Sequence, residues 1–218
     1  MNRILYHGSS NIIEKPIFGI GNHHNDYGLG FYCCANIELA RQCASRTSGN
    51  GFVNKYHLRD DRLSILDLTS GDYNNVLVWI ALLMKNRTIT QNLQKQYKRE
   101  LDYLFNNYLI DTKRYDVIIG YRADDAYFKF PESFIRSQIT IDSLNKIYKA
   151  GDLGKQYVLM SQRAFNLIKF DGYELSDITD KEEYYKRKSQ ADKKYSELIE
   201  KSRYVKGERL IDLVSDHV

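Results

Sequence analysis

The sequence predicts an α+β fold, because segments typical of strands and segments typical of helices are mixed along the chain. Two short apolar segments that stop at a glycine, RILYHG (3–8) and YDVIIG (115–120), are typical of strands. Apolar residues recur at helical spacing in 37–44 and 94–109. With 218 residues, the chain has the length of one domain that can bury a core.

The first half of the chain predicts strands around one capped helix. A second strand is expected at FYCC (31–34), followed by a helix at about 37–45. Asn36 stands where its side chain can accept a hydrogen bond from a free N–H group of that helix. Two further strands at 52–58 and 63–68, separated by the turn sequence RDDR, predict a β-hairpin.

The second half alternates between helices and strands. The apolar run VLVWIALLM (76–84) indicates a buried helix, since its nine residues are about half of what a membrane span requires. The expected elements are helices at 74–85 and 94–109, a strand at 115–120, a helix at 140–151 ending at Gly151, a strand at 155–160, a helical turn at 161–168 and a strand at 169–175.

The C-terminal tail contains more Lys and Arg than Asp and Glu between residues 180 and 209. Mixed charge favours a solvated helix that packs through Tyr195, Leu198 and Ile199, and a nucleic-acid-binding arm is the alternative. The sequence therefore divides into a main domain at 1–175, with a helical insert at about 74–110, and a charged helical tail at 176–218.

Composition argues against several classes of protein. A net charge of +4 is mild and does not by itself indicate nucleic-acid binding. Three closely spaced cysteines are too few for the disulfide framework of a small secreted domain. The N-terminal residues show no apolar run of the signal-peptide type. These observations predict a cytoplasmic protein without a membrane partner.

Common cofactor motifs are not matched. FGIGNHHNDYGLG begins like a dinucleotide fingerprint, but the third glycine of that spacing falls on His24. A zinc site is not expected, because His23 and His24, like Cys33 and Cys34, are adjacent, and adjacent side chains on a strand point to opposite faces. Neither a nucleophile elbow nor a phosphate-binding P-loop is found. No metal is expected.

The stretch DYGLGFY (26–32) places two glycines directly before an aromatic pair. Glycine is used where a ligand approaches the backbone closely, or where a strand bulges or turns. Alternation along the strand puts Phe31 and Tyr32 on opposite faces, so that if one of these side chains faces a pocket, the other faces the core.

Three stretches carry a family resemblance when they are taken together: LYHGSS (5–10), DYGLGFYCC (26–34) and LGKQYVLMSQRA (153–164). Their order resembles the ADP-ribosyltransferase superfamily, in its diphtheria-toxin and poly(ADP-ribose) polymerase branch. With YDVIIGYRADD (115–125), the chain is more closely similar, over about residues 3–172, to the bacterial family called domain of unknown function 3990. The resemblance implies split antiparallel sheets around an NAD cleft.

The resemblance also implies roles for individual residues, with NAD as co-substrate. The imidazole of His7 would bind the adenosine ribose, and the backbone of Gly8 the nicotinamide amide. Tyr32 would stack on the nicotinamide ring. Gly28 and Gly30 would bend the strand and keep it low under the dinucleotide.

The third position of the pattern carries Gln156 where the polymerases have a glutamate. A glutamine can hydrogen-bond a ribose hydroxyl but brings no negative charge, which favours single transfer over chain elongation. Asp124 and Asp125 are candidates to supply the charge, whereas Asp116 is interpreted as a structural cap. Arg122 would pair with the pyrophosphate or is an ordinary surface arginine.

The implied activity is mono-ADP-ribosyl transfer from NAD to a macromolecule, with a protein target favoured over nucleic acid. A role as a toxin or defence effector, with an antitoxin or inhibitor as partner, follows from the same analogy. Two alternatives stay open: an NAD glycohydrolase, and an inactive module that binds NAD or ADP-ribose.

Overall fold

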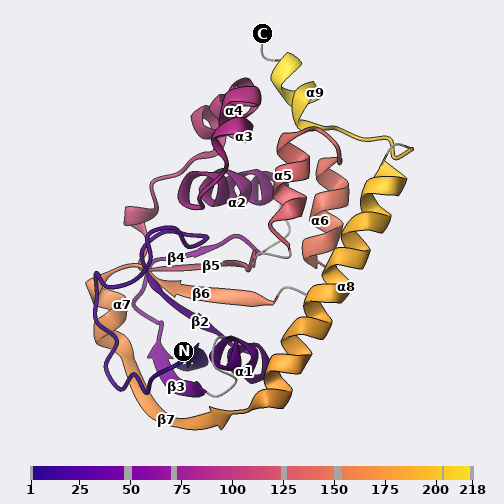
Figure 1. Cartoon of the computed structure of the whole chain (residues 1–218). Helices are drawn as coiled ribbons and strands as arrows, with labels where there is room; N and C mark the ends of the chain where they lie inside the picture. The colour runs from indigo at the N-terminus through magenta and orange to yellow at the C-terminus, as the bar shows by residue number, and fades with distance from the viewer. Residues whose placement is uncertain are drawn as a thin grey trace.

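The computed structural model describes residues 2–46, 51–69, 73–123, 127–149, 154–202 and 204–216. Over these residues it is an α+β fold with one sheet of seven strands in the order β4-β5-β6-β2-β1-β3-β7 (Figure 1). The strands are β1 (Asn2–Ser9), β2 (Phe31–Cys34), β3 (Gly51–Arg59), β4 (Ile65–Asp67), β5 (Val117–Tyr121), β6 (Lys155–Leu159) and β7 (Ile168–Ser176). The helices are α1 (Ile37–Ser45), α2 (Tyr73–Asn86), α3 (Gln91–Gln96), α4 (Lys98–Tyr108), the short 3₁₀ helix η1 (Thr112–Arg114), α5 (Lys129–Ile135), α6 (Ile141–Lys149), α7 (Gln162–Leu167), α8 (Ile178–Ser202) and α9 (Leu210–Ser215).

The strands form one sheet, whereas the resemblance implied split sheets. β6 lies between β5 and β2 and is antiparallel to both, so it joins the two halves of the sheet. In the described sheet, β1 and β2 are in register at Tyr6 and Cys34, while β1 and β3 are paired along the whole length of β1. The expectation of two small sheets is therefore wrong, and the shortest pairing of the single sheet lies between β1 and β2.

The expected hairpin of β3 and β4 is also wrong. β3 is antiparallel to β1 on one side and to β7 on the other, so both of its edges are occupied. The chain turns after Asp60, which forms an ion pair with Arg3 of β1. It then crosses to the far edge of the sheet, where β4 runs parallel to β5. Both strands exist, but their partners come from parts of the chain that a local pattern does not specify.

Alternation of side chains gives the sheet two differently covered faces. Ile118, Val158 and Tyr32 belong to the larger core, in which α2 supplies Trp79. The opposite face carries the smaller core, whose members include residues of β1, β2 and α7. Helix α1 packs on the same face as the larger core, because its alanines cluster with Tyr6 and Cys34. The face that carries α1 and α2 is the face that carries the candidate site.

Several local predictions are confirmed. Asn36 caps α1 by accepting a hydrogen bond of 2.9 Å from the N–H of Glu38. The apolar run at 76–84 is part of the buried helix α2.

The stretch 94–109, predicted as one helix, is divided between α3 and α4, because the backbone of Tyr97 leaves the helical conformation. Gly151, expected to end a helix, lies outside the described residues.

Asp116 has the structural role that was expected of it. Its carboxylate accepts hydrogen bonds from the N–H of Ser64, at 2.9 Å, and from the hydroxyl of Ser161. These contacts connect the start of β5 with the segments beside β4 and β6. Asp116 therefore stabilises the sheet edge.

The tail forms the long helix α8, which runs along the side of the domain (Figure 1). Tyr195, Leu198 and Ile199 pack against the larger core, as predicted. The Tyr195 hydroxyl lies 2.9 Å from that of Ser133, and Arg187 donates to the side chain of Gln42 in α1. Within the described residues, none of the helices combines the length and apolar character needed to cross a bilayer.

Candidate functional site

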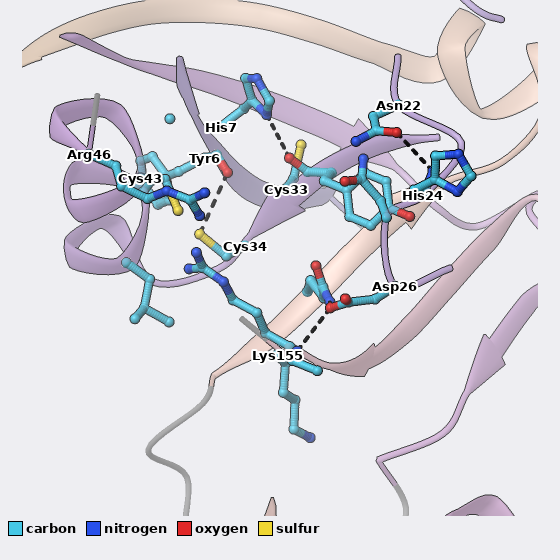
Figure 2. Close-up of a pocket in the computed structure, with 18 of the residues that line it drawn as sticks. Tyr6, His7, Asn22, His24, Asp26, Cys33, Cys34, Cys43, Arg46 and Lys155 are labelled. Atoms are coloured by element: carbon cyan, nitrogen blue, oxygen red, sulfur yellow. Dashed lines mark hydrogen bonds between the residues drawn. The ribbon is translucent and has the colours of Figure 1, made fainter. Parts of the chain in front are cut away.

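A cavity of about 480 Å³ opens on the face of the sheet that carries α1 (Figure 2). Its walls come from β1, β2, β6 and α1, and from the segments that precede β2 and follow α2 and β5. Pockets for small ligands in proteins usually have volumes of about 300–1,000 Å³. The cavity is therefore large enough for a ligand of nucleotide size.

The structure brings several predicted site residues to this cavity. Those that line it are His7, Gly8, Tyr32, Arg122 and Gln156. Gly28 and Gly30 are not among its lining residues. Asp124 and Asp125 lie outside the described residues.

The floor of the cavity includes a row of residues in register across neighbouring strands. Tyr6 of β1 pairs with Cys34 of β2, and Cys34 pairs with Gln156 of β6. Gln156 pairs in turn with Gly120 of β5. Because directly paired residues share a face of the sheet, this row places Gln156 on the same face as Tyr6.

Asp26 contributes a buried carboxylate to the cavity. Its Oδ2 accepts hydrogen bonds from Nε2 of Gln156 at 2.7 Å and from the N–H of Ala123 at 2.9 Å. Its Oδ1 lies 3.3 Å from the guanidinium of Arg87. Burial raises the pKa of the Asp26 carboxyl, although the Ala123 N–H, the charges of Arg87 and Arg122 and the Gln156 amide oppose the shift.

The turn before β2 fixes the position of Asp26. Gly28 has φ +80°, a conformation that favours glycine, and its N–H donates to the carbonyl of Asn25 at 2.9 Å. Asn86 donates to the Asp26 carbonyl. Tyr27 lies against Gly120, where a Cβ would overlap the tyrosine ring, and its hydroxyl donates to the Tyr121 carbonyl at 2.9 Å. The backbone on both sides of the carboxylate is therefore anchored.

Gly30 has a packing role in the structure. A Cβ at this position would lie 2.6 Å from Cγ1 of Val158 and 2.9 Å from the carbonyl oxygen of Leu159. The missing side chain lets the chain run close to β6. Together with the turn at Gly28, this close approach carries the chain into β2 at Tyr32.

Tyr32 and Phe31 point to opposite faces, as predicted. The Tyr32 ring packs against the larger core and lines the cavity. Its hydroxyl donates to the Gly28 carbonyl at 2.6 Å and accepts from the N–H of Tyr27 at 3.1 Å. Phe31 belongs to the smaller core, where its ring meets that of Tyr56 edge-on at 5.5 Å.

His7 lies at the short β1–β2 pairing, on the opposite side of the cavity from Asp26 (Figure 2). Its Nδ1 is 2.6 Å from the Tyr32 carbonyl oxygen, which can only accept, so Nδ1 carries the proton and Nε2 is an acceptor. Burial lowers the pKa of the imidazole, and the hydrogen bond to Tyr32 opposes that shift. The ring also contacts that of Phe31, with centroids 4.5 Å apart.

Gly8 allows α1 to pack directly on β1. A Cβ at Gly8 would overlap the carbonyl oxygen of Ala40 and lie 2.7 Å from the backbone nitrogen of Ala44. These are backbone atoms of α1 that cannot move independently. Glycine at this position therefore sets how closely α1, one wall of the cavity, approaches the sheet.

Basic side chains dominate the charge of the cavity. Among the described lining residues, four are Lys or Arg and Asp26 is the acidic one; the basic residues are Arg46, Arg87, Arg122 and Lys155. In Figure 2, the Arg46 side chain extends from the end of α1 towards Cys34. An excess of positive charge around a cavity attracts anionic ligands.

In the part of the chain that the structure describes, the cysteines lack the features of a catalytic nucleophile or of a metal site. All three are free thiols, and Cys34 and Cys43 line the cavity. Burial, and to a lesser degree Cys43, raises the pKa of Cys34 to about 12, so its thiol is protonated at neutral pH. Within the described part of the chain, His, Cys, Asp and Glu residues form no group of three suited to a metal ion.

Sequence reasoning missed Asp26, Arg46 and Arg87 as residues of the site. Asp26 is the first residue of the stretch DYGLGFY, whose conspicuous features are its glycines and aromatic residues. A useful signal was its place before a glycine turn that opens a pocket-facing strand. The two arginines follow the ends of α1 and α2, where charged residues are common.

A family model described as "protein of unknown function (DUF3990)" matches residues 3–170. Neither the curated proteins nor the solved structures contain a significant match to the chain. The matched region extends from Arg3 in β1 to the first residues of β7 and includes every described residue of the cavity. The chain therefore belongs to the DUF3990 family.

Proposed function

We propose that the cavity binds NAD and that the protein is a mono-ADP-ribosyltransferase of the ADP-ribosyltransferase superfamily. The main support is that the three stretches at 5–10, 26–34 and 153–164, which carry the sequence resemblance, supply residues to a single cavity. His7, Tyr32 and Gln156 come from β1, β2 and β6, which are consecutive strands of the sheet. A pattern spread over the whole domain thus converges on one site.

The charge of the cavity supports an anionic ligand such as a dinucleotide. Arginine binds phosphate oxygens through two parallel hydrogen bonds. We assign Arg46 and Arg122 to the pyrophosphate, because both line the cavity near Cys34, whereas Arg87 is paired with Asp26. The neutral imidazole of His7 offers Nε2 as an acceptor for a hydroxyl of the adenosine ribose.

The proposed reaction breaks the bond between C1′ of the nicotinamide ribose and the nicotinamide nitrogen. The bonding electrons leave with neutral nicotinamide, and the ribose becomes cationic, as in glycoside cleavage. A lone pair of the acceptor then forms the new bond to C1′, and the acceptor loses its proton to solvent. Gln156 would hold a ribose hydroxyl, Tyr32 would stack on nicotinamide, and the buried charge of Asp26 would favour the cation.

Asp124 and Asp125 stay candidates for a further catalytic carboxylate. They follow Arg122 and Ala123 in the chain, and both of these residues line the cavity. The substitutions Asp124→Asn and Asp125→Asn keep the side-chain shape and remove the charge. Slower nicotinamide release with unchanged NAD binding supports a catalytic role for either residue, and an unchanged rate in both variants rules that role out.

A protein is the proposed acceptor, since the modest net charge of +4 gives no specific support for nucleic acid. Three free cysteines are compatible with a reducing cytoplasm as the setting. By family analogy, the protein would act as a toxin or defence effector that is restrained by an antitoxin or inhibitor.

The proposal is tested with NAD labelled in its adenylate phosphate, purified protein and cell lysate. We expect release of nicotinamide and transfer of label to material that protease, but not nuclease, removes. Nicotinamide release with all label in free ADP-ribose would identify a glycohydrolase instead. Binding of NAD without release would identify a binding module, and failure to bind either NAD or ADP-ribose would refute the proposal.

A further inference from the structure

We infer that Asp26 is a positioning residue. It orients the side-chain amide of Gln156 so that the carbonyl oxygen, rather than the NH₂ group, faces the cavity and can accept a hydrogen bond there. The two side chains are 130 residues apart in the sequence and meet through a buried hydrogen bond of 2.7 Å. What Gln156 binds rests on the proposed function, whereas the orientation of its amide does not.

The hydrogen-bond partners of Gln156 determine which positions the nitrogen and the oxygen of its amide occupy. Nε2 lies 2.7 Å from Oδ2 of Asp26 and 3.4 Å from the Tyr121 carbonyl oxygen. A carboxylate and a backbone carbonyl can only accept hydrogen bonds. The reversed amide would place Oε1 against two acceptors and lose both bonds, so the network selects a single orientation.

The oxygen of the amide is thereby left for a ligand. Gln156 lines the cavity, and Oε1 has no hydrogen-bond donor among the described residues. An acceptor facing the cavity has the same hydrogen-bonding character as the carboxylate of a glutamate. Gln156 can therefore accept a hydrogen bond from a ribose hydroxyl, as a glutamate would. The negative charge lies instead on the carboxylate of Asp26, which is hydrogen-bonded to the other end of the amide.

Asp26 is rigid enough for this task. Its Oδ2 is also held by the Ala123 N–H, and its Oδ1 by Arg87 at 3.3 Å. The neighbouring ring of Tyr27 lies against Gly120, the strand position paired with Gln156. The loop that carries the carboxylate is thus packed on β5, next to the β6 strand that carries the amide.

The inference predicts the effect of Asp26→Asn. The new amide has a single acceptor oxygen, for which Arg87 competes with Gln156 and Ala123. When that oxygen turns to Arg87, the NH₂ group of Asn faces Gln156, and the orientation of the Gln156 amide is no longer fixed. Loss of one fixed hydrogen-bonding group in an active site reduces turnover by about 10²–10³-fold. We expect a loss of that order in nicotinamide release, with a much smaller change in NAD affinity.

A second substitution tests positioning against simple structural damage. In the double variant Asp26→Asn/Gln156→Glu, the new amide at 26 donates to the new carboxylate at 156, which again presents an acceptor to the cavity. We expect the double variant to recover most of the lost turnover. If Asp26→Asn alone does not fold, a folded and active double variant supports the inference, and a folded but inactive one overturns it.

Asp116→Asn is the matched control. Asp116 is also a buried carboxylate that holds neighbouring segments together, but it does not line the cavity. Its substitution should lower stability without a specific loss of turnover, and Gln156→Glu should not rescue it. Equal rescue of both aspartate variants would contradict a positioning role.

An experiment without NAD separates this inference from the proposed function. In ¹⁵N spectra of the ligand-free protein, the side-chain NH₂ protons of Gln156 should exchange slowly in the wild type and in Asp116→Asn. They should exchange rapidly in Asp26→Asn. Equal exchange rates in the wild type and in Asp26→Asn would overturn the inference, whether or not NAD binds. Slow exchange in the wild type and rapid exchange in Asp26→Asn, in a protein that does not bind NAD, would overturn only the proposed function.

Discussion

Tyr27 lies over Gly120 in the space where any other residue would carry its side chain. A Cβ on Gly120 would be 2.5 Å from Cζ of the tyrosine ring, which no pair of unbonded carbon atoms tolerates. The Tyr27 hydroxyl is held by the carbonyl of the next residue, Tyr121, at 2.9 Å. Since Asp26 precedes Tyr27 directly, this contact also sets the height of the Asp26 carboxylate above the sheet.

Gly120→Ala is therefore expected to displace Tyr27 and, with it, Asp26. Overpacking of a tight interior typically costs about 1–3 kcal/mol. We expect a loss of this size in the free energy of unfolding, measured in urea, and a fall in nicotinamide release. In the background Tyr27→Ala the same substitution should cost less, because the clash is gone. Additive losses in the double variant would show that the two residues do not interact.

Tyr32→Ala is expected to weaken NAD binding much more than Phe31→Ala does. The Tyr32 ring lines the cavity, whereas the Phe31 ring packs in the smaller core. Phe31→Ala should instead lower the free energy of unfolding. The loss should be at or below the lower end of the range of about 3–5 kcal/mol that is typical of a fully buried phenylalanine, since the Phe31 ring is only partly buried. Calorimetric titration with NAD and urea unfolding of both variants measure the two effects. Equal losses of affinity would contradict the assignment of faces.

His7 should make stability depend on pH. Because burial lowers the folded-state pKa below the ordinary value of 6.5, the unfolded chain takes up the His7 proton first on acidification. The contribution of this group is complete above about pH 6.5 and is lost as pH falls towards the folded-state pKa. Urea unfolding of wild type and His7→Phe, compared from about pH 7.5 to 5, isolates this term. A difference in stability that does not change over this range would contradict burial of a neutral imidazole.

Arg46→Gln is expected to reduce the affinity for NAD and for ADP-ribose to a similar degree. A hydrogen bond to a charged group contributes about 1.5–3 kcal/mol, which corresponds to roughly 10–150-fold in affinity. Binding should also depend less on salt in the variant, because one cation of the cavity is lost. The control is Arg59→Gln, an exposed arginine at the end of β3 that does not line the cavity. Equal effects of both substitutions would argue against a phosphate contact.

Local sequence patterns predicted local structure well. The Asn36 cap, the buried helix at 76–84 and the apolar strand β5, which ends at Tyr121 instead of Gly120, each depend on a few neighbouring residues. The hairpin of β3 and β4 failed because strand pairing is decided by distant partners: β7 competes for the edge of β3, and β5 offers a parallel edge to β4. Pairing between distant strands also explains the single sheet. β6 pairs with both β2 and β5 and so joins the strands that had been expected to form two sheets.

The candidate site was predictable as far as its residues carry a recognisable pattern. His7, Tyr32 and Gln156 were selected by resemblance, and all three line the cavity. Asp26 was not, because an aspartate before a glycine turn is commonplace in sequences. Its importance comes from Gln156, Arg87 and Ala123, which reach it only in the folded chain.

The place of β6 inside the sheet, between β5 and β2, has a consequence for how the sheet assembles during synthesis. β6 is the sixth of seven strands to leave the ribosome, yet it separates β5 from β2 in the finished sheet. Until residues 155–159 are synthesised, the β4–β5 pair has no connection through the sheet to β1, β2 and β3. Contacts between distant parts of a chain form late and slowly. A nascent chain thus carries His7 and Tyr32 for most of its synthesis before Gln156, on β6, completes the cavity that these residues line.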